Sequence, residues 1–232
     1  MSSTPSQQFL CVLQGNTQGF MDKQDLIHKE LTASDAKILV DVFLFQESFL
    51  TEDKLKRHKL TGYHLYHRQR DANGTQSRGG ATIGVKDDSR WLHKEVHRSP
   101  EGCPIESITV VVTSMDGTTE VYFTSAYCRP GKDITEAHLR MAFPSNEVPP
   151  NSKWIVGTDA NAHHTLWDSF KEEDTRGNMF ADFMAAEDLV CENDPFQPTR
   201  TKTVAHVHER RLLHTKRPTQ VRTSRCPEMR PR

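Results

Sequence analysis

Four polar side chains that could bind a metal ion or take part in catalysis follow a single apolar run. The run "WIVG", residues 154–157, is followed closely by Asp159, Asn161, His163 and His164. Carboxylate and amide oxygens suit a hard cation such as Mg²⁺, whereas imidazole nitrogens suit zinc and other transition metals. No Cys or suitably spaced His completes a tetrahedral zinc set, so the chemistry expected here is that of oxygen ligands.

Two more polar residues follow apolar runs in the same manner. Asn16 follows "LCVLQG", and Glu47 follows "DVFLFQ". Active sites of layered α/β proteins gather at strand ends, so we expect these two residues to share one rim with Asp159 and Asn161. Such a rim would hold Mg²⁺ or Mn²⁺ and leave coordination positions open for a phosphodiester. Taken alone, Glu47 is more often a solvated strand-end residue and Asn16 a turn residue.

The elements that must position these residues are those of a layered α/β domain. Apolar runs bounded by turn residues predict strands at residues 9–16, 38–46, 63–67, 81–85, 106–114, 120–128, 153–158 and 189–193. Helical spacing of apolar residues predicts helices at residues 22–31, 134–143 and 174–189. Strands with helices between them favour mixed sheets that are covered by helices.

Composition limits the class of protein. The chain has 232 residues with 35% hydrophobic content, which is enough for one substantial domain. It contains no apolar run of about 18 residues and no apolar segment typical of a secretory signal, so we expect an intracellular protein with no membrane span. The five Cys are scattered, which argues against a disulfide framework or a structural zinc site.

Charge is distributed unevenly along the chain. Residues 201–232 contain nine Lys or Arg and two Asp or Glu, so their net charge is +7. Residues 1–200 contain 21 basic and 29 acidic residues, a net charge of −8, and the two parts sum to the −1 of the whole chain. Low hydrophobicity with excess charge predicts a disordered segment after residue 200.

Six sequence blocks occur in order along residues 9–200. They are "QGNTQG", "FLFQESFL", "SRGGATIGV", "TSAYCRP", "GTDANAHHTLWDS" and "RGNMFADFMAAEDLVCENDPFQPTR". This set resembles the endonuclease domain of non-LTR retrotransposons, within the endonuclease/exonuclease/phosphatase superfamily that includes abasic-site endonucleases. The resemblance implies a four-layer α/β sandwich of two mixed β-sheets flanked by helices, and metal-assisted hydrolysis of phosphodiesters.

The resemblance also implies roles for individual residues. Glu47, Asn16 and Asp159 match the family's metal-site residues. Asp159 also matches the aspartate that orients or deprotonates the attacking water, and Asn161 the asparagine that stabilises the transition state. Tyr127 matches a tyrosine near the scissile phosphate.

Four more positions match the family less specifically. His163 and His164 match the His pair typical of the retrotransposon branch, although adjacent side chains point in different directions. Thr199 and Arg200 match a position near the substrate backbone.

The end of the chain departs from the family pattern. The resemblance implies a closing Ser-Asp-His triplet on a final strand, in which the His acts on the scissile phosphate and the Asp orients it. No Asp-His dipeptide occurs in this chain, and no Asp follows Asp194. We therefore expect the last strands to be missing and catalysis to be impaired. The expected organisation is a flexible segment 1–8, an endonuclease-like domain 9–200 and an unrelated basic segment 201–232.

Partners and alternatives follow from the same comparison. The resemblance implies a monomer that nicks DNA in the nucleus, where the nick would prime the reverse transcriptase of the parent element. A non-catalytic nucleic-acid-binding remnant, whose basic tail contacts phosphates, is the main alternative. A phosphatase acting on small phosphoesters is disfavoured by the His-His and Leu-Trp-x-Ser blocks.

Overall fold

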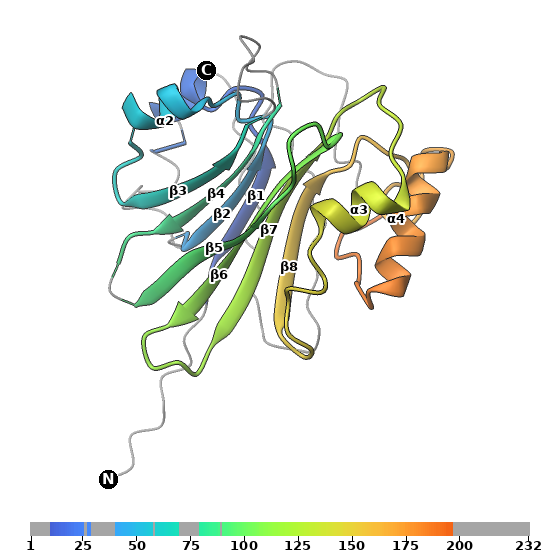
Figure 1. The fold of residues 1–232 in the computed structure, drawn as a ribbon. Coiled ribbons are helices and arrows are strands. Elements are labelled where there is room, and N and C mark those ends of the chain that lie inside the picture. Colours follow the sequence, from blue (N-terminus) through green and yellow to red (C-terminus); the bar gives the residue numbers. More distant parts are fainter. Residues whose placement is uncertain are drawn as a thin grey trace.

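Two β-sheets packed face to face form the centre of the molecule, and helices cover their outer faces (Figure 1). The structure is a computed structural model that describes residues 10–25, 27–28, 40–57, 59–69, 79–88 and 90–196. The predicted boundaries near residues 8 and 200 lie outside these ranges.

The first sheet is built from the N-terminal part of the chain. Its strands are β1 (Val12–Asn16), β2 (Val42–Gln46), β4 (Ala81–Lys86) and β3 (Tyr63–Arg68), in that spatial order. β1 and β2 are parallel, and β4 runs antiparallel to both of its neighbours. Every residue of β2 is buried, as its continuous apolar run predicts for a strand covered on both faces.

The second sheet contains β5 (Trp91–Arg98), β6 (Ile105–Ser114), β7 (Glu120–Cys128) and β8 (Lys153–Asp159), in that order. β5, β6 and β7 are joined as antiparallel neighbours, and β8 lies parallel to β7. β6 and β7 form a hairpin, with Gly117 in its turn at φ 69°.

Three apolar clusters lie between four layers, which are the two sheets and the helices on their outer faces. The central cluster lies between the sheets and contains, among others, Val42, Leu44, Ile83, Val110, Phe123 and Ile155. A second cluster lies on the outer face of the first sheet, beneath η1 (Met21–Lys23) and α2 (Glu52–Arg57). A third lies on the outer face of the second sheet, beneath α3 (Glu136–Ala142) and α4 (Thr175–Ala186). The expected four-layer sandwich of mixed sheets is therefore confirmed.

The sequence of α4 explains why a helix forms at this place. Asp174 is the N-cap, and its side chain accepts a hydrogen bond from the backbone of Gly177. Phe180, Phe183 and Met184 recur at helical spacing and are buried against the second sheet. The apolar face of this helix therefore belongs to the core.

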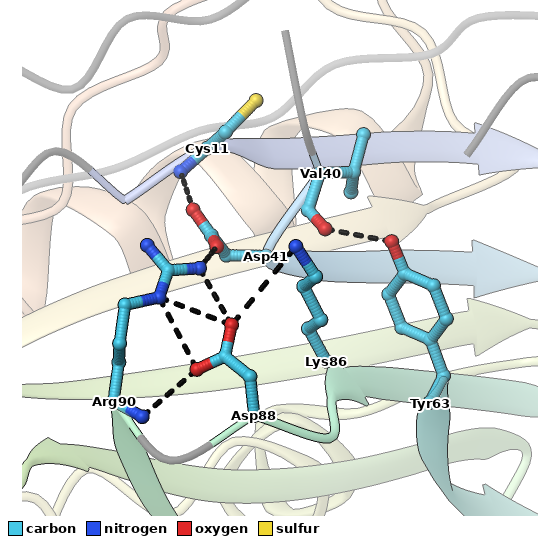
Figure 2. A network of polar contacts seen from close by, with 7 residues as sticks. All are labelled: Cys11, Val40, Asp41, Tyr63, Lys86, Asp88 and Arg90. Carbon is cyan, nitrogen blue, oxygen red and sulfur yellow. Dashed lines mark hydrogen bonds and ion pairs between the residues drawn. The ribbon is translucent and has the colours of Figure 1, made fainter. Parts of the chain in front are cut away.

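A polar network lies at the end of the first sheet where β1 and β2 begin (Figure 2). The buried Asp41 accepts hydrogen bonds from the backbone of Cys11 at 2.9 Å and from Arg90 Nη2 at 2.6 Å. Arg90 also pairs with Asp88, whose carboxylate lies 4.0 Å from Lys86 Nζ. The network joins the starts of β1 and β2 to the connection between the two sheets.

The secondary structure differs from the prediction at two segments, and a third segment is described only in part. The strand β5 was not predicted, and residues 189–193 are not a strand although one was expected there. Val190 in that segment is exposed, and the backbone N–H of Leu189 bonds to Met184 O rather than to a neighbouring strand. The predicted helix 22–31 is described only in part and begins with the 3-10 turn η1.

No helix among the described residues has the length and apolar character needed to cross a membrane.

Candidate active site

The side chains of Asn16, Glu47 and Asp159 lie in direct contact. Asn16 Nδ2 donates hydrogen bonds to Glu47 Oε1 at 2.8 Å and to Asp159 Oδ2 at 2.7 Å. Asn16 is 4% exposed and Asp159 is 1% exposed, whereas Glu47 is half-buried. We call these three residues the acidic rim. One amide therefore holds two carboxylates side by side at the edge of the solvent.

The sheet topology explains why these residues meet. Asn16 is the last residue of β1 and Glu47 follows the last residue of β2, and these two strands are parallel. Asp159 is the last residue of β8 in the facing sheet, and β1 and β2 both contact β8. The acidic rim is thus shared by both sheets and forms only when they are packed together.

Buried amides join the two sheets beneath the acidic rim. Gln46 Nε2 donates to Ser125 Oγ at 3.0 Å and to Gly157 O at 3.2 Å. Gln14 Nε2 donates to Thr158 O at 3.3 Å. A Cβ at Gly157 would lie 2.9 Å from Leu44 Cδ1, so the close approach of the sheets requires glycine there. These polar residues were not assigned a role from the sequence, although their place inside apolar strands was a visible signal.

The backbone around Glu47 adopts a conformation that is rare for residues other than glycine. Glu47 has a φ of 48° and Phe49 a φ of 53°. The carbonyl of Glu47 accepts a hydrogen bond from Gly19 N at 2.8 Å, and Phe49 N donates to Gly79 O at 3.0 Å. Strained residues held in this way cluster at functional sites.

His67 supports the same loop from the interior. His67 Nε2 donates to Leu50 O at 2.9 Å, which leaves Nδ1 to accept from Thr82 Oγ1 at 2.9 Å. Burial lowers the pKa of His67 to about 4, so the imidazole is neutral at neutral pH. Gly80 lies against this ring, because a Cβ there would be 2.8 Å from His67 Cε1. Gly79 and Gly80 directly precede β4 and have positive φ values of 103° and 88°.

Asn161 and Tyr127 lie beside Asp159. The backbone N–H of Asn161 donates to Asp159 Oδ1 at 3.3 Å, and Asn161 Nδ2 donates to Cys128 O at 2.8 Å. Asn161 has a φ of 47°, a third positive value at the site. Tyr127 is the register partner of Asp159 in the β7–β8 ladder and is buried.

The two adjacent His residues lie further along the same loop. His163 is exposed, and its backbone N–H donates to Asp174 Oδ2 at 3.1 Å. The imidazole of His164 lies 5.2 Å from the ring of Trp167, between ring centroids, and its Nε2 is 3.6 Å from Glu173 Oε1. The side chain of His164 is thus part of the loop that Trp167 anchors.

Trp167 acts as a packing anchor. Its ring is buried in the third cluster, and Trp167 Nε1 donates to Ala162 O at 3.1 Å. Thr199 and Arg200, which the sequence predicts near the substrate, lie outside the described residues.

The fold is similar to that of several solved structures. The AP endonuclease LMAP from Leishmania major is 14% identical and has a TM-score of 0.56, over 81% of this chain and 69% of that one. The catalytic domain of Xenopus laevis APE2 is also 14% identical, with a TM-score of 0.53 over 74% and 67% of the two chains. An endonuclease/exonuclease/phosphatase family protein from Leptotrichia buccalis has a TM-score of 0.51 at 14% identity, over 88% and 86%.

The chain has the endonuclease/exonuclease/phosphatase fold. A family described as endonuclease-reverse transcriptase matches residues 121–209. This match supports the predicted resemblance to retroelement endonucleases, and its range covers β7 from residue 121 onward, β8, α4 and the loop of Asp159. No curated protein matches the chain by sequence.

Within this endonuclease/exonuclease/phosphatase fold, the acidic rim has the ligand chemistry of a hard cation. Two carboxylates are held together by the Asn16 amide, and oxygen ligands of this kind suit Mg²⁺ or Mn²⁺. The described residues contain no group of three or more His, Cys, Asp or Glu arranged to hold a metal. The residues that fit a cation are therefore Glu47 and Asp159, with water and substrate oxygens as the further ligands.

Proposed function

We propose that the chain hydrolyses phosphodiester bonds in DNA at the acidic rim, with Mg²⁺ or Mn²⁺ bound, as the endonuclease of a retroelement. The observation that carries the proposal is the bridging of Glu47 and Asp159 by Asn16, at the strand ends of an endonuclease/exonuclease/phosphatase fold. In such an element, the monomeric protein would nick DNA in the nucleus, and the nick would prime the element's reverse transcriptase.

Each residue has a role that its position allows. Glu47 and Asp159 would hold the cation, which when bound supplies charge stabilisation to the phosphoryl oxygens. Asp159 would orient the attacking water and take its proton. Asn161, two residues further on, would donate hydrogen bonds to the negatively charged transition state. Asn16 keeps both carboxylates in one geometry, because it donates to each of them.

The proposed rate is low. The resemblance places an Asp-His pair in the catalytic group, and the chain contains no Asp-His dipeptide. Removing one member of a cooperating catalytic set usually removes most of the rate. We therefore propose that this chain nicks DNA far more slowly than an endonuclease of the same fold that has the Asp-His pair.

Nicking of supercoiled plasmid tests the proposal. The purified chain should convert plasmid to the open-circular form slowly in Mg²⁺ or Mn²⁺ and not in EDTA. Glu47→Gln and Asp159→Asn should each lower the residual rate at least tenfold, while Glu95→Gln, at a surface ion pair with Arg98, should not. Metal-independent nicking, or equal rates in all variants, would contradict a site at the acidic rim. Rapid nicking would contradict the proposed impairment.

The second candidate is a nucleic-acid-binding protein without catalysis. It is favoured by the nine basic residues of the segment 201–232. Replacing Arg210, Arg211, Lys216 and Arg217 by Gln in the full chain should then weaken DNA binding and lower the salt slope by about 3–4. Tail-dependent binding without any Glu47-dependent nicking would favour this candidate over the enzyme.

A further inference from the structure

The first turn of α4 holds the loop that follows Asp159. Asp174 Oδ1 accepts from Gly177 N at 2.6 Å, which caps the helix. Its other carboxylate oxygen, Oδ2, accepts from His163 N at 3.1 Å, and Asp174 N donates to His163 O at 3.0 Å. One aspartate therefore caps the helix and fixes the loop at the same time.

Gly177 brings the helix and the loop unusually close. A Cβ at this position would lie 1.8 Å from the carbonyl oxygen of His163 and 2.6 Å from its carbonyl carbon. Real Cβ atoms do not approach backbone so closely, so any other residue must push the helix and loop apart. Glycine is required here because there is no space for a Cβ. Its backbone conformation does not require glycine, since its φ lies outside the positive range.

Arg176 connects this loop to a second loop. Arg176 Nη1 donates to Asn161 O at 3.3 Å and lies 3.5 Å from Ala160 O, while Nη2 donates to Lys132 O. Lys132 belongs to the connection between β7 and α3. A planar guanidinium with several donors in a fixed geometry can hold carbonyls of two segments together, which a lysine cannot reproduce.

Arg176 holds one of the strained segments at the candidate active site. Asn161 has a φ of 47°, and such a conformation costs free energy that its surroundings must supply. Its backbone N–H contacts Asp159 Oδ1, and its side-chain amide donates to Cys128 O. A shift of the Asn161 peptide would therefore move the groups beside the acidic rim.

We propose that Arg176 is a positioning residue, which holds Asn161 in its left-handed conformation and so sets the orientation of Asp159 and Asn161 toward the DNA backbone. The proposal rests on the proposed function for its consequence in catalysis. Its structural part stands on the hydrogen bonds of Arg176 alone.

Arg176→Gln and Arg176→Lys test the structural part in the full chain. Arg140→Gln is the matched control, because Arg140 is an exposed arginine that pairs with Glu136 and Glu187. The side-chain amide signals of Asn161 and Asn16 are followed by NMR after selective ¹⁵N labelling of asparagine, without metal or DNA. In Arg176→Gln, solvent exchange of the Asn161 amide should rise at least tenfold, while the Asn16 signals and the melting temperature stay close to those of the unmodified chain.

Cleavage kinetics test the catalytic part. Arg176→Gln should lower kcat about 10–100-fold and leave KM within about twofold, because misplacement of a reacting group by about 1 Å has an effect of this size. Arg176→Lys should recover only part of the loss, and Arg140→Gln should match the unmodified chain.

Each outcome supports or overturns a separate statement. Unchanged Asn161 signals in Arg176→Gln would overturn the positioning role. Movement of the Asn16 and Asn161 signals together, with a large fall in melting temperature, would show a general structural role and would also overturn it. If the unmodified chain shows no metal-dependent nicking, the proposed function fails, and the NMR result alone decides the role of Arg176.

Discussion

The side-chain nitrogen of Asn16 lies 2.7 Å from Asp159 Oδ2, and this hydrogen bond joins residues 143 positions apart in the sequence. Asn16 ends a strand of the first sheet and Asp159 ends a strand of the second. The same Asn16 nitrogen also binds Glu47, so the position of both carboxylates depends on one amide.

Asn16→Ala should destabilise the protein when no metal is present. The substitution removes the shared donor of Glu47 and Asp159 and leaves two carboxylates close together. A lost hydrogen bond to a buried charged group costs about 1–3 kcal/mol. Urea denaturation in EDTA measures the change, with Gln18→Ala, at an exposed neighbouring position, as the control. A free energy of unfolding equal in both variants would show that the bridge carries no stability.

Glu47→Gln should abolish stabilisation by divalent cations. A ligand that binds only the folded state raises stability by about 2.7 kcal/mol at 100 times its Kd. Thermal unfolding of the unmodified chain should therefore shift upward with added Mg²⁺ or Mn²⁺, and the shift should disappear in Glu47→Gln. The surface variant Glu95→Gln should keep it. A shift that persists in Glu47→Gln would place the cation elsewhere.

Stability should fall as the pH is lowered from about 6.5 to about 4. The pKa of His67 is lowered to about 4 by burial, below the value near 6.5 of an unfolded chain. The unfolded state therefore binds the extra proton within this window, and the free energy of unfolding decreases as the pH falls through it. A shift of this size corresponds to about 3 kcal/mol over the whole window.

His67→Gln isolates this contribution, because glutamine does not titrate. Chemical denaturation between pH 4 and 7 should give a shallower dependence of stability on pH in His67→Gln than in the unmodified chain. Equal slopes would mean that other groups cause the loss of stability in acid.

Gly177→Ala should destabilise the protein, against the usual preference of helices for alanine. Alanine is favoured over glycine by about 1 kcal/mol in a helix interior. Here its Cβ would overlap the carbonyl of His163, and overpacking of this kind costs about 1–3 kcal/mol. Asn178→Ala, on the exposed side of the same turn, should be neutral or slightly stabilising. Stabilisation by Gly177→Ala would show that the loop can move away at little cost.

Arg90→Gln should cost more stability than Arg98→Gln. Both arginine side chains are 43% exposed, but the partner Asp41 is 5% exposed whereas the partner Glu95 is 31% exposed. Surface pairs contribute about 0–1 kcal/mol, and loss of one partner of a buried carboxylate costs more, here about 1–3 kcal/mol. Equal losses of stability in urea denaturation would indicate that the hydrogen bond from Cys11 N alone is enough to stabilise the Asp41 carboxylate.

Much of the fold could be predicted from local pattern. Continuous apolar runs located most strands, because strands buried on both faces need apolar residues at every position. β5 was not predicted because it lies at a sheet edge and carries charged residues, Lys94, Glu95 and Arg98, on its exposed positions. Residues 189–193 were apolar for a different reason, since Leu189 and Cys191 pack against the core without entering a strand.

The candidate site was predictable only in its residues at strand ends. Asn16, Glu47 and Asp159 stand out because polar residues interrupt apolar runs there. The roles of Gln46 and Arg176 depend on contacts between distant segments, Gln46 with the facing sheet and Arg176 with two loops. A polar residue inside an apolar strand, such as Gln46, signals a buried polar role, but the sequence pattern does not say which distant segment it contacts, because those contacts are set by how the layers pack.

The sharing of the acidic rim between two sheets has a consequence for protein synthesis. Asn16 and Glu47 leave the ribosome long before Asp159, which follows after roughly 6–20 seconds at about 5–20 residues per second. During this interval the nascent chain has only one carboxylate of the acidic rim, because β8, which ends in Asp159, has not been added. Under the proposed function, a partly synthesised copy could not cut nucleic acid until β8 and then α4, which carries Arg176, are complete.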